Sequence, residues 1–333
     1  MRATVLAGSA ESPPVGPGEA VEVMTGGTVP SGADAVVPVE HTRIRGEGAK
    51  RILELETDPR PGANVRAAGE MGPRGRVLLE AGRRLTLEDL VAAAGCGADP
   101  LAVHPRPRVA VLSTGDEVVS WRQNPGPHQV RDSNRLATAL GLGRAGGEVV
   151  ICDRVKDEAP AIRAAVERAL EEACLIVTIG GVSMGRKDLL PGIFEGLGVD
   201  RLFHGVKIQP GKPVWAGRKG SRLVLGLPGN PVSALVILEL FAVPLLARLS
   251  GGTPQVPRGL EAGIAGGSVR SRFRPRFLPA SLEPGTEGGP PRTTPRPQSG
   301  SGDWTALAGA QALLFLPPET AVEPGRPVSF LRL

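Results

Sequence analysis

The sequence predicts a multi-domain α/β protein in which a central parallel sheet is flanked by β-rich segments. In the central part of the chain, apolar runs alternate with helical patterns, as in parallel sheets that helices cover on both faces. On either side of it, short apolar runs are separated by glycine and proline turns, which is typical of small β units. The 46 glycines and 33 prolines among 333 residues favour tight turns and short strands.

The patterns divide the chain into four blocks: residues 1–58, 59–105, 106–252 and 256–333. In the first block, apolar runs at 21–24 and 35–39 predict a β-rich domain. In the second block, 77–79 is a candidate strand and 87–94 a predicted helix. Thr86 is the expected N-cap of this helix, because an aspartate three residues later gives the start of a capping box.

The third block alternates strands with helices of ordinary length. The predicted strands lie at 109–112, 148–151, 175–179 and 222–225. The predicted helices lie at 133–140, at 160–173, after Asp188, and at 231–249. In such sheets ligands bind outside the carboxyl ends of the strands, so the loops that follow the strands are where chemistry is expected.

The fourth block returns to β-like sequence. The runs 272–278 and 312–316 are candidate strands, and 283–301 is expected to be a loose loop because it is rich in Pro, Gly, Ser and Thr.

Three loops that follow predicted strands, 113–117, 180–188 and 226–233, all contain glycines, and the first two also contain carboxylates. A fourth loop, 207–213, adds the two cations Lys207 and Lys212. Glycines allow the backbone to approach a ligand closely, and helix N-termini favour phosphate. Carboxylates at the same edge suit a divalent metal. The loops therefore predict an anionic, phosphorylated ligand that is held together with a metal ion.

Each of these loops also has a plain structural explanation. Glycine pairs serve as ordinary turns, Asp157 could be a helix N-cap, and Asp116 could cap a turn. Lys207 and Lys212 could be solvated surface charges. The sequence contains no P-loop, and the match to G-x-G-x-x-G at 141–146 follows a helix rather than a strand, which indicates a helix stop.

Composition argues against several other classes of protein. The formal net charge of +5 is mild, only 3% of the residues are aromatic and tyrosine is absent, which disfavours nucleic-acid binding. The sequence has no uninterrupted run of about 18 apolar residues, so no membrane span is expected. The first residues show no signal pattern, so a cytoplasmic protein is expected. Cys96, Cys152 and Cys174 are expected to be buried thiols of a reducing compartment.

Several motifs occur together in one order along the chain. The run 24–37, Met-Thr-Gly-Gly-Thr-Val-Pro-Ser-Gly-Ala-Asp-Ala-Val-Val, resembles the MTGA-x-VP-x-GADAVV signature of the molybdopterin molybdenumtransferases, the MoeA family. Further motifs follow in the order of that family at 60–66, 69–70, 113–117, 132–134, 180–188, 210–213 and 226–233. The resemblance covers most of the chain, although the fourth block contributes little to it.

The resemblance implies an elongated homodimer. The second block would be a partial linker or dimerisation domain, and the third a molybdopterin-binding domain of the kind found in MogA-like molybdopterin adenylyltransferases, one of which would be a candidate partner. The fourth block would be a small C-terminal β-barrel. The family takes part in molybdenum cofactor biosynthesis: it inserts molybdate into adenylylated molybdopterin and releases AMP, with a divalent cation such as Mg²⁺.

The resemblance also assigns roles to individual residues. The expected catalytic residues are Thr25, Glu117, Asp157 and Asp188, of which Glu117 and Asp188 would bind the metal. The expected substrate-binding residues are Gly180, Gly181, Ser183, Lys207, Lys212, Pro228, Asn230, Pro231, Ser233 and Ser301. Ser301 would contact the ligand from the partner subunit.

Other interpretations stay open at this stage. Family members carry a further segment, with a Met-Asp-Gly-Tyr-Ala motif, before the position that matches Met1, and the sequence lacks it. A catalytically impaired molybdopterin-binding or scaffold paralogue is therefore the alternative. A molybdopterin adenylyltransferase is a third interpretation, against which the flanking β blocks argue. The sequence does not distinguish molybdate from tungstate.

Overall fold

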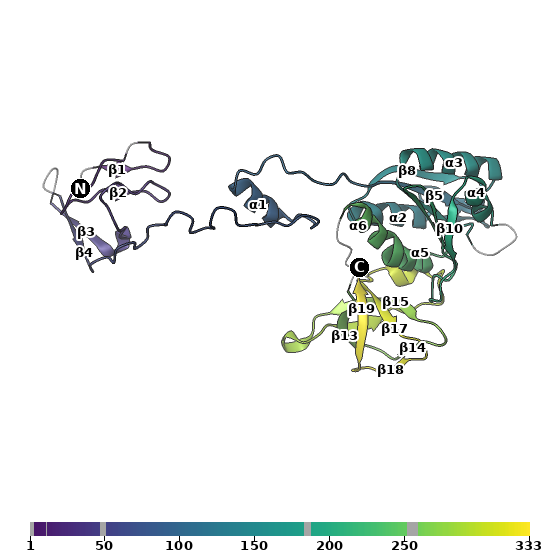
Figure 1. Ribbon diagram of the computed structural model, residues 1–333. Helices are drawn as coiled ribbons and strands as arrows, with labels where there is room; N and C mark the ends of the chain where they lie inside the picture. The colour runs from purple at the N-terminus through teal and green to yellow at the C-terminus, as the bar shows by residue number, and fades with distance from the viewer. Residues whose placement is uncertain (1–2, 11, 47–50, 183–187, 252–258) are drawn as a thin grey trace. The chain divides into compact units, whose positions relative to one another are not determined.

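The computed structural model describes residues 3–10, 12–46, 51–182, 188–251 and 259–333 (Figure 1). By its internal contacts the chain forms two compact units, Met1–Leu79 and Glu80–Leu333.

The first unit consists of short strands and turns. β1 (Thr4–Val5) pairs in parallel with β2 (Glu22–Val23), and β3 (Thr42–Arg45) pairs in antiparallel with β4 (Ile52–Leu55). The apolar run at 35–39 forms no strand; it is irregular and leads into the 3₁₀ turn η1 (Val39–His41). The candidate strand at 77–79 is also wrong: this segment has no strand partner among the described residues, and Val77 is 71% exposed.

The second unit begins with α1 (Leu87–Gly95), which has the predicted capping box. The Thr86 hydroxyl accepts a hydrogen bond from the Asp89 amide, and the Asp89 carboxylate accepts one from the Thr86 amide. These two bonds satisfy N–H groups that the first helical turn otherwise leaves without partners.

The centre of the second unit is a six-stranded sheet of order β10-β11-β12-β9-β5-β8. Its strands are β5 (Arg108–Thr114), β8 (Glu148–Val155), β9 (Leu175–Ile179), β10 (Asp200–His204), β11 (Trp215–Lys219) and β12 (Arg222–Leu227). β12, β9, β5 and β8 are mutually parallel, whereas β11 is antiparallel to both of its neighbours. A separate two-stranded pair, β6 (Val118–Val119) and β7 (Val130–Arg131), lies in the loop after β5.

Helices cover both faces of the sheet, as the sequence predicts. They are α2 (Ser133–Arg144), α3 (Ala159–Glu172), α4 (Leu190–Gly196), α5 (Pro231–Ile237), the π-helical turn η3 (Leu238–Ala242) and α6 (Val243–Leu249). On one face α3 buries Ile162, Val166 and Leu170 together with residues of α4. On the other face α2, α5, η3 and α6 bury Leu142, Ile237 and Leu246 against the strands.

The segments α5, η3 and α6 form one continuous helix from Pro231 to Leu249. By length and composition alone this helix could cross a membrane, but most of it is buried inside the fold. Its apolar character is that of a core helix, because it packs on the central sheet along its length.

The C-terminal segment forms a closed five-stranded barrel of order β13-β16-β15-β17-β19. Its strands are β13 (Glu261–Ala265), β15 (Arg276–Glu283), β16 (Arg292–Pro295), β17 (Ala312–Leu316) and β19 (Pro327–Arg332). β14 (Val269–Arg270) and β18 (Ala321–Val322) pair beside it, and η4 (Thr286–Gly288) and η5 (Trp304–Leu307) are short turns between strands. The α/β fold class with a small C-terminal barrel is therefore confirmed.

Two expectations about the second unit need correction. The segment 283–301 is not all loop, because β16 lies within it and buries Thr293 completely. None of the three cysteines is buried: Cys96 is exposed, and Cys152 and Cys174 are half-buried. All three thiols are free.

Candidate functional site

Five loops of the second unit meet at one edge of the central sheet. β12, β9, β5 and β8 are parallel, and β10 shares their direction because β11 is antiparallel to both β10 and β12. Their carboxyl ends therefore lie at the same edge. The segments that follow them carry Glu117, Asp157, Gly180, Lys207 and Asn230. The topology thus places the predicted residues of the central domain along one side of the sheet.

The turn after β5 presents Glu117 at this edge. Gly115 has a φ of +136°, and a Cβ added there would lie 2.8 Å from Oε2 of Glu117. The glutamate side chain therefore folds back over a position that only glycine can occupy without displacing it. The Glu117 carbonyl accepts a hydrogen bond of 2.8 Å from the Val130 amide, which fixes the backbone of this turn.

The glycine pair after β9 packs closely on its neighbours. The Gly180 amide donates to the Leu227 carbonyl over 3.0 Å. A Cβ on Gly180 would lie 2.9 Å from the Thr114 carbonyl oxygen, and the φ of Gly180 is +85°. Gly180 is therefore required by both space and backbone conformation. Ser183 lies outside the described residues, and Asp188 follows that gap as a half-buried residue ahead of α4.

The loop after β12 is fastened to two other elements. The side-chain amide of Asn134, from the first turn of α2, donates to the Gly229 carbonyl over 2.6 Å. The side-chain amide of Asn230 donates to the Ser301 hydroxyl over 2.8 Å, and the Val232 amide donates to the Ser301 carbonyl over 3.1 Å. Ser301 of the barrel segment thus lies against Asn230 of the same chain. Pro228 and Ser233 are buried, and Pro231 is half-buried at the start of α5.

The two predicted lysines lie on the loop between β10 and β11. The Val206 amide donates to the Lys212 carbonyl over 3.0 Å, so the loop closes on itself. The Gln209 amide donates to the Pro275 carbonyl over 2.9 Å, and Gln209 accepts from the Phe277 amide over 2.8 Å at the start of the barrel. The side chains of Lys207 and Lys212 are exposed. A backbone held at several points therefore presents two cations to solvent at the sheet edge.

The carboxylates differ in their surroundings. Asp157 is half-buried and precedes α3, but Glu158 is the N-cap of that helix, so the N-cap explanation for Asp157 is wrong. Glu117 is exposed. Within the described ranges no three His, Cys, Asp or Glu side chains come close enough to hold a metal ion by themselves. Magnesium is commonly bound by only one or two carboxylates, with water and phosphate oxygens as its other ligands.

Thr25 belongs to the first compact unit, whereas the other predicted residues belong to the second. Its turn is closed by a hydrogen bond of 2.7 Å from the Gly27 amide to the Met24 carbonyl, and its side chain is exposed. The φ of Gly26 is +81°, which explains the glycine next to Thr25 in the motif.

A buried polar network between the end of β5 and the start of α2 was not assigned a role from the sequence. The Asp132 carboxylate, 3% exposed as a residue, accepts hydrogen bonds from the Ser113 hydroxyl over 2.6 Å and from Nε of Arg135 over 2.7 Å. The Arg135 guanidinium also donates to the Cys152 carbonyl over 2.8 Å and lies 5.2 Å from the centre of the Trp121 ring. Burial disfavours the charged guanidinium, but the hydrogen bond and charge of Asp132 outweigh it and raise the pKa of Arg135. The motif at 132–134 marks this place in the sequence, but only the fold shows these partners.

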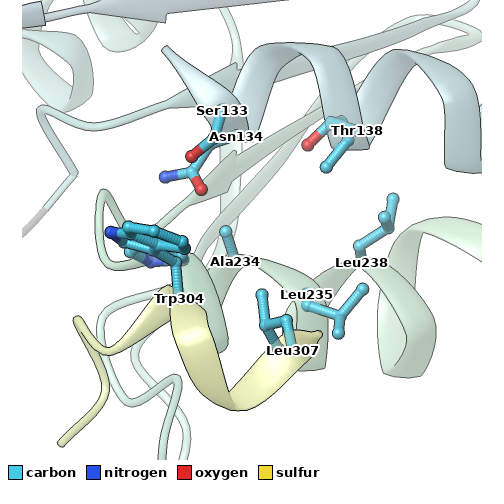
Figure 2. Close-up of a pocket in the computed structure, with 10 residues that line it drawn as sticks. Ser133, Asn134, Thr138, Ala234, Leu235, Leu238, Trp304 and Leu307 are labelled. Atoms are coloured by element: carbon cyan, nitrogen blue, oxygen red, sulfur yellow. The ribbon is translucent and has the colours of Figure 1, made fainter. Parts of the chain in front are cut away.

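A small cavity of about 220 Å³ lies beside the loop after β12 (Figure 2). Its walls come from α2, α5, η3 and η5, and they include Asn134, Thr138, Leu235, Leu238, Trp304 and Leu307. In Figure 2 the α2 side chains face those of α5 and η5 across the open space, and Trp304 lies at one end of it. Sequence reasoning did not single out Trp304. The available signals were that tryptophan is scarce in this sequence and that Trp304 lies two positions after the run Ser-Gly-Ser-Gly at 299–302.

Comparisons with known proteins agree with this architecture. Three family models match: the MoeA N-terminal region (domain I and II) over residues 2–97, a probable molybdopterin-binding domain over 110–248, and the MoeA C-terminal region (domain IV) over 264–333. The chain is 32% identical over 327 residues to the molybdopterin molybdenumtransferase of Bacillus subtilis. That alignment covers 98% of this chain and 75% of the relative. It is 34% identical over 329 residues to molybdopterin molybdenumtransferase 2 of Mycobacterium tuberculosis, and this alignment covers 96% of this chain and 78% of the relative.

A solved structure of a MoeA protein has the same fold as this chain. The molybdopterin biosynthesis MoeA protein of Pyrococcus horikoshii superposes with a TM-score of 0.80 at 30% identity, over 99% of this chain and 80% of that one. The sequence identity, the domain order and the fold lead to one conclusion: the chain belongs to the molybdopterin molybdenumtransferases, the MoeA family of enzymes of molybdenum cofactor biosynthesis.

Proposed function

We propose that this chain inserts molybdate into adenylylated molybdopterin and releases AMP, as a cytoplasmic enzyme of molybdenum cofactor biosynthesis. The observation that carries the proposal is the convergence of five loops at one edge of the central sheet, with glycine turns, two exposed lysines and three carboxylates. Family membership supports the same assignment. The substrates are anionic at two phosphates and at molybdate, and the edge combines groups that bind anions with groups that bind cations.

The anion-binding groups have separate roles. Lys207 and Lys212 bind phosphate or molybdate oxygens as point charges. The glycine turns at Gly180 and Gly181 let backbone amides approach the ligand. The helix that starts at Pro231 adds the positive end of its dipole. Pro228, Asn230 and Ser233 shape this loop, and Ser183 is proposed as a further contact on the basis of the family motif alone.

Magnesium fits the carboxylates at this edge. Mg²⁺ takes oxygen ligands and is commonly bound by one or two carboxylates together with substrate phosphates, so a set of three protein ligands is not required. Glu117 and Asp188 are the proposed protein ligands. When bound, the ion would offset the negative charge of the pyrophosphate.

The reaction then requires an attack at the adenylate phosphorus. A water oxygen forms the new P–O bond, the bond to the molybdopterin phosphate breaks, and adenylate leaves as AMP. Asp157 orients the attacking water and accepts its proton. Thr25, which belongs to the other compact unit, is proposed as a catalytic residue from its motif.

Assembly is part of the proposal. We expect a homodimer that uses the 59–105 segment, because α1 exposes Leu87, Leu90 and Val91. Ser301 would then contact the ligand of the partner subunit in addition to Asn230, and a molybdopterin adenylyltransferase would supply the substrate. The proposed domains are 1–58, 59–105, 106–252 and 256–333, and limited proteolysis tests these boundaries.

The test is a reconstitution with adenylylated molybdopterin, molybdate and Mg²⁺, in which AMP release is measured. Lys212→Ala is expected to lower kcat/KM roughly 10- to 100-fold, the loss expected for one charged contact. Lys219→Ala is the matched control, since Lys219 is an exposed lysine at the other end of β11 and pairs in register with Arg222. Equal rates for both variants would contradict the assignment of Lys212. Binding of the adenylate by the wild type without AMP release would favour the molybdopterin-holding alternative.

A further inference from the structure

The cavity between α2, α5, η3 and η5 is the right size for one ring system. Its volume is about 220 Å³. Pockets that enclose whole drug-sized ligands usually measure roughly 300–1,000 Å³. The walls are largely aliphatic, with Leu235, Leu238 and Leu307 below and the polar Asn134 and Thr138 above (Figure 2). A space of this size and polarity fits a flat heterocycle better than a sugar or a phosphate.

Trp304 stands out among the few aromatic residues of this chain. The sequence has three tryptophans and no tyrosine. Trp215 is fully buried in the core, and Trp121 lies under the guanidinium groups of Arg122 and Arg135. Trp304 instead is 66% exposed at the mouth of the cavity. Aromatic faces in such positions stack on flat rings, and base–aromatic stacking stabilises binding by about 1–3 kcal/mol per base.

The turn that carries Trp304 is held firmly. The Asp303 carboxylate accepts hydrogen bonds from the Ser299 amide over 2.9 Å and the Ser299 hydroxyl over 3.1 Å on one oxygen. Its other oxygen accepts from the amide and hydroxyl of Thr305. Ala306, two residues after the tryptophan, is 2% exposed and anchors the turn in the fold. The indole is therefore presented from a fixed backbone, which lowers the ordering cost of binding.

The cavity is continuous with the candidate site. Asn134 lines the cavity and at the same time donates to the Gly229 carbonyl in the loop after β12. Pro231 lines the cavity and begins the helix that follows this loop. Ser301, three residues before Trp304, accepts the hydrogen bond of Asn230. A ligand with its phosphate at this loop would therefore have a ring within reach of the cavity.

We infer that Trp304 and this cavity bind a flat fused heterocycle of the substrate by stacking, and that Trp304 is a specificity-determining residue. The inference rests on the proposed function, because it takes the ligand to be adenylylated molybdopterin. That molecule has two fused heterocycles, adenine and pterin. Both share the chemistry of a flat ring with polar edges, which the α2 side of the cavity can meet through Asn134 and Thr138.

Calorimetric titration of the full chain tests the inference. The ligands are AMP, 6-hydroxymethylpterin and ribose 5-phosphate, which has the phosphate without a ring. Trp304→Ala is expected to raise the Kd of one ring-bearing ligand roughly 5- to 150-fold, and Trp304→Phe is expected to restore most of the affinity. The ligand whose Kd changes identifies the ring. Ribose 5-phosphate is expected to bind all variants alike.

Phe273→Ala is the matched control, because Phe273 is another exposed aromatic residue, 84% exposed, outside the cavity lining. Thermal unfolding of each variant confirms that it is folded. If the wild type releases AMP and Trp304→Ala binds AMP and pterin as the wild type does, the inference is overturned and the proposed function stands. If the wild type neither releases AMP nor binds any of these ligands, both are overturned.

Discussion

Asn230 donates a hydrogen bond of 2.8 Å to the hydroxyl of Ser301, and this bond joins a loop of the central sheet to a loop of the C-terminal barrel. The Val232 amide reinforces it through the Ser301 carbonyl. Residues 71 positions apart in the sequence thus hold one part of the candidate site in shape. The barrel segment contributes to the site directly, although its sequence carries little of the family resemblance.

Removing this bond tests how much the barrel supports the site. Asn230→Ala and Ser301→Ala are each expected to raise the KM for the adenylylated substrate roughly 2- to 10-fold, since a net hydrogen bond is worth about 0.5–1.5 kcal/mol. The double variant is expected to lose no more than the larger single loss, because both changes remove the same bond. Additive losses would show that the two residues act separately. Ser221→Ala, an exposed serine between β11 and β12, is the control.

A methyl group at Gly115 is expected to displace Glu117. The added Cβ would lie 2.8 Å from Oε2 of Glu117, at a backbone φ of +136° that side chains rarely adopt. Gly115→Ala is expected to destabilise the fold by about 1–3 kcal/mol and to lower kcat/KM at least about tenfold. Urea unfolding and AMP release measure the two effects. Gly126→Ala lies in the same loop, where the nearest atom would be 3.5 Å away, and is expected to change neither.

The buried pair of Asp132 and Arg135 is expected to be important for stability. Their side chains are 2% and 11% exposed and are joined over 2.7 Å. Arg135→Met leaves the Asp132 carboxylate buried without its cation, which is expected to cost about 3–5 kcal/mol in the free energy of unfolding. Arg131→Met, a change at an exposed arginine four residues earlier, is the comparison and is expected to be nearly neutral. Similar midpoints of urea unfolding for both variants would contradict this role.

Acid is expected to loosen the turn that carries Trp304. Hydrogen bonds from the Thr305 side chain and the Ser299 backbone lower the pKa of Asp303 from 3.8 to about 2. A depressed pKa in the folded state means that the carboxylate stabilises the turn fully above about pH 4, and that this contribution is lost as the pH falls toward 2. Trp304 fluorescence followed between pH 5 and pH 2 is expected to report the loss. Asp303→Asn is expected to remove this pH dependence, whereas Asp58→Asn, a change in the other unit, should leave it as it is.

The parts of the fold that the sequence predicts are those with a strong local pattern. β5 and β9 are continuous apolar runs and were expected, and α3 shows its buried stripe at Ile162, Val166 and Leu170. β10 and β11 were not predicted. β10 is an edge strand with an exposed Asp200, Arg201 and Leu202, so it lacks an apolar run, and β11 owes its burial to its neighbours. The predicted strand at 77–79 has an apolar run but no partner in the described part of the chain.

In the candidate site, too, the parts with a local sequence pattern were predictable and the parts that depend on the fold were not. The loops after β5, β9 and β12 are visible in the sequence because glycines follow apolar runs, and the lysine loop is visible only by its two cations and its motif. The order of the motifs identifies the family. The network of Asp132, Arg135 and Ser113 could not be predicted, because it depends on which strand lies beside which. Trp304 was also missed, since its significance comes from the helices that the fold brings opposite it.

The helix from Pro231 to Leu249 has one further consequence. It buries Ile237 and Leu246 against the central sheet, while Val236 packs with Phe277, Leu313 and Leu331 of the barrel. Leu235 and Ile208 contact both clusters. The sheet domain and the barrel therefore bury apolar surface against each other. Either one expressed alone would expose that apolar surface to water. This shared interface couples the evolution of the two parts. A substitution that makes a barrel side chain at the interface smaller requires a compensating substitution on the helix.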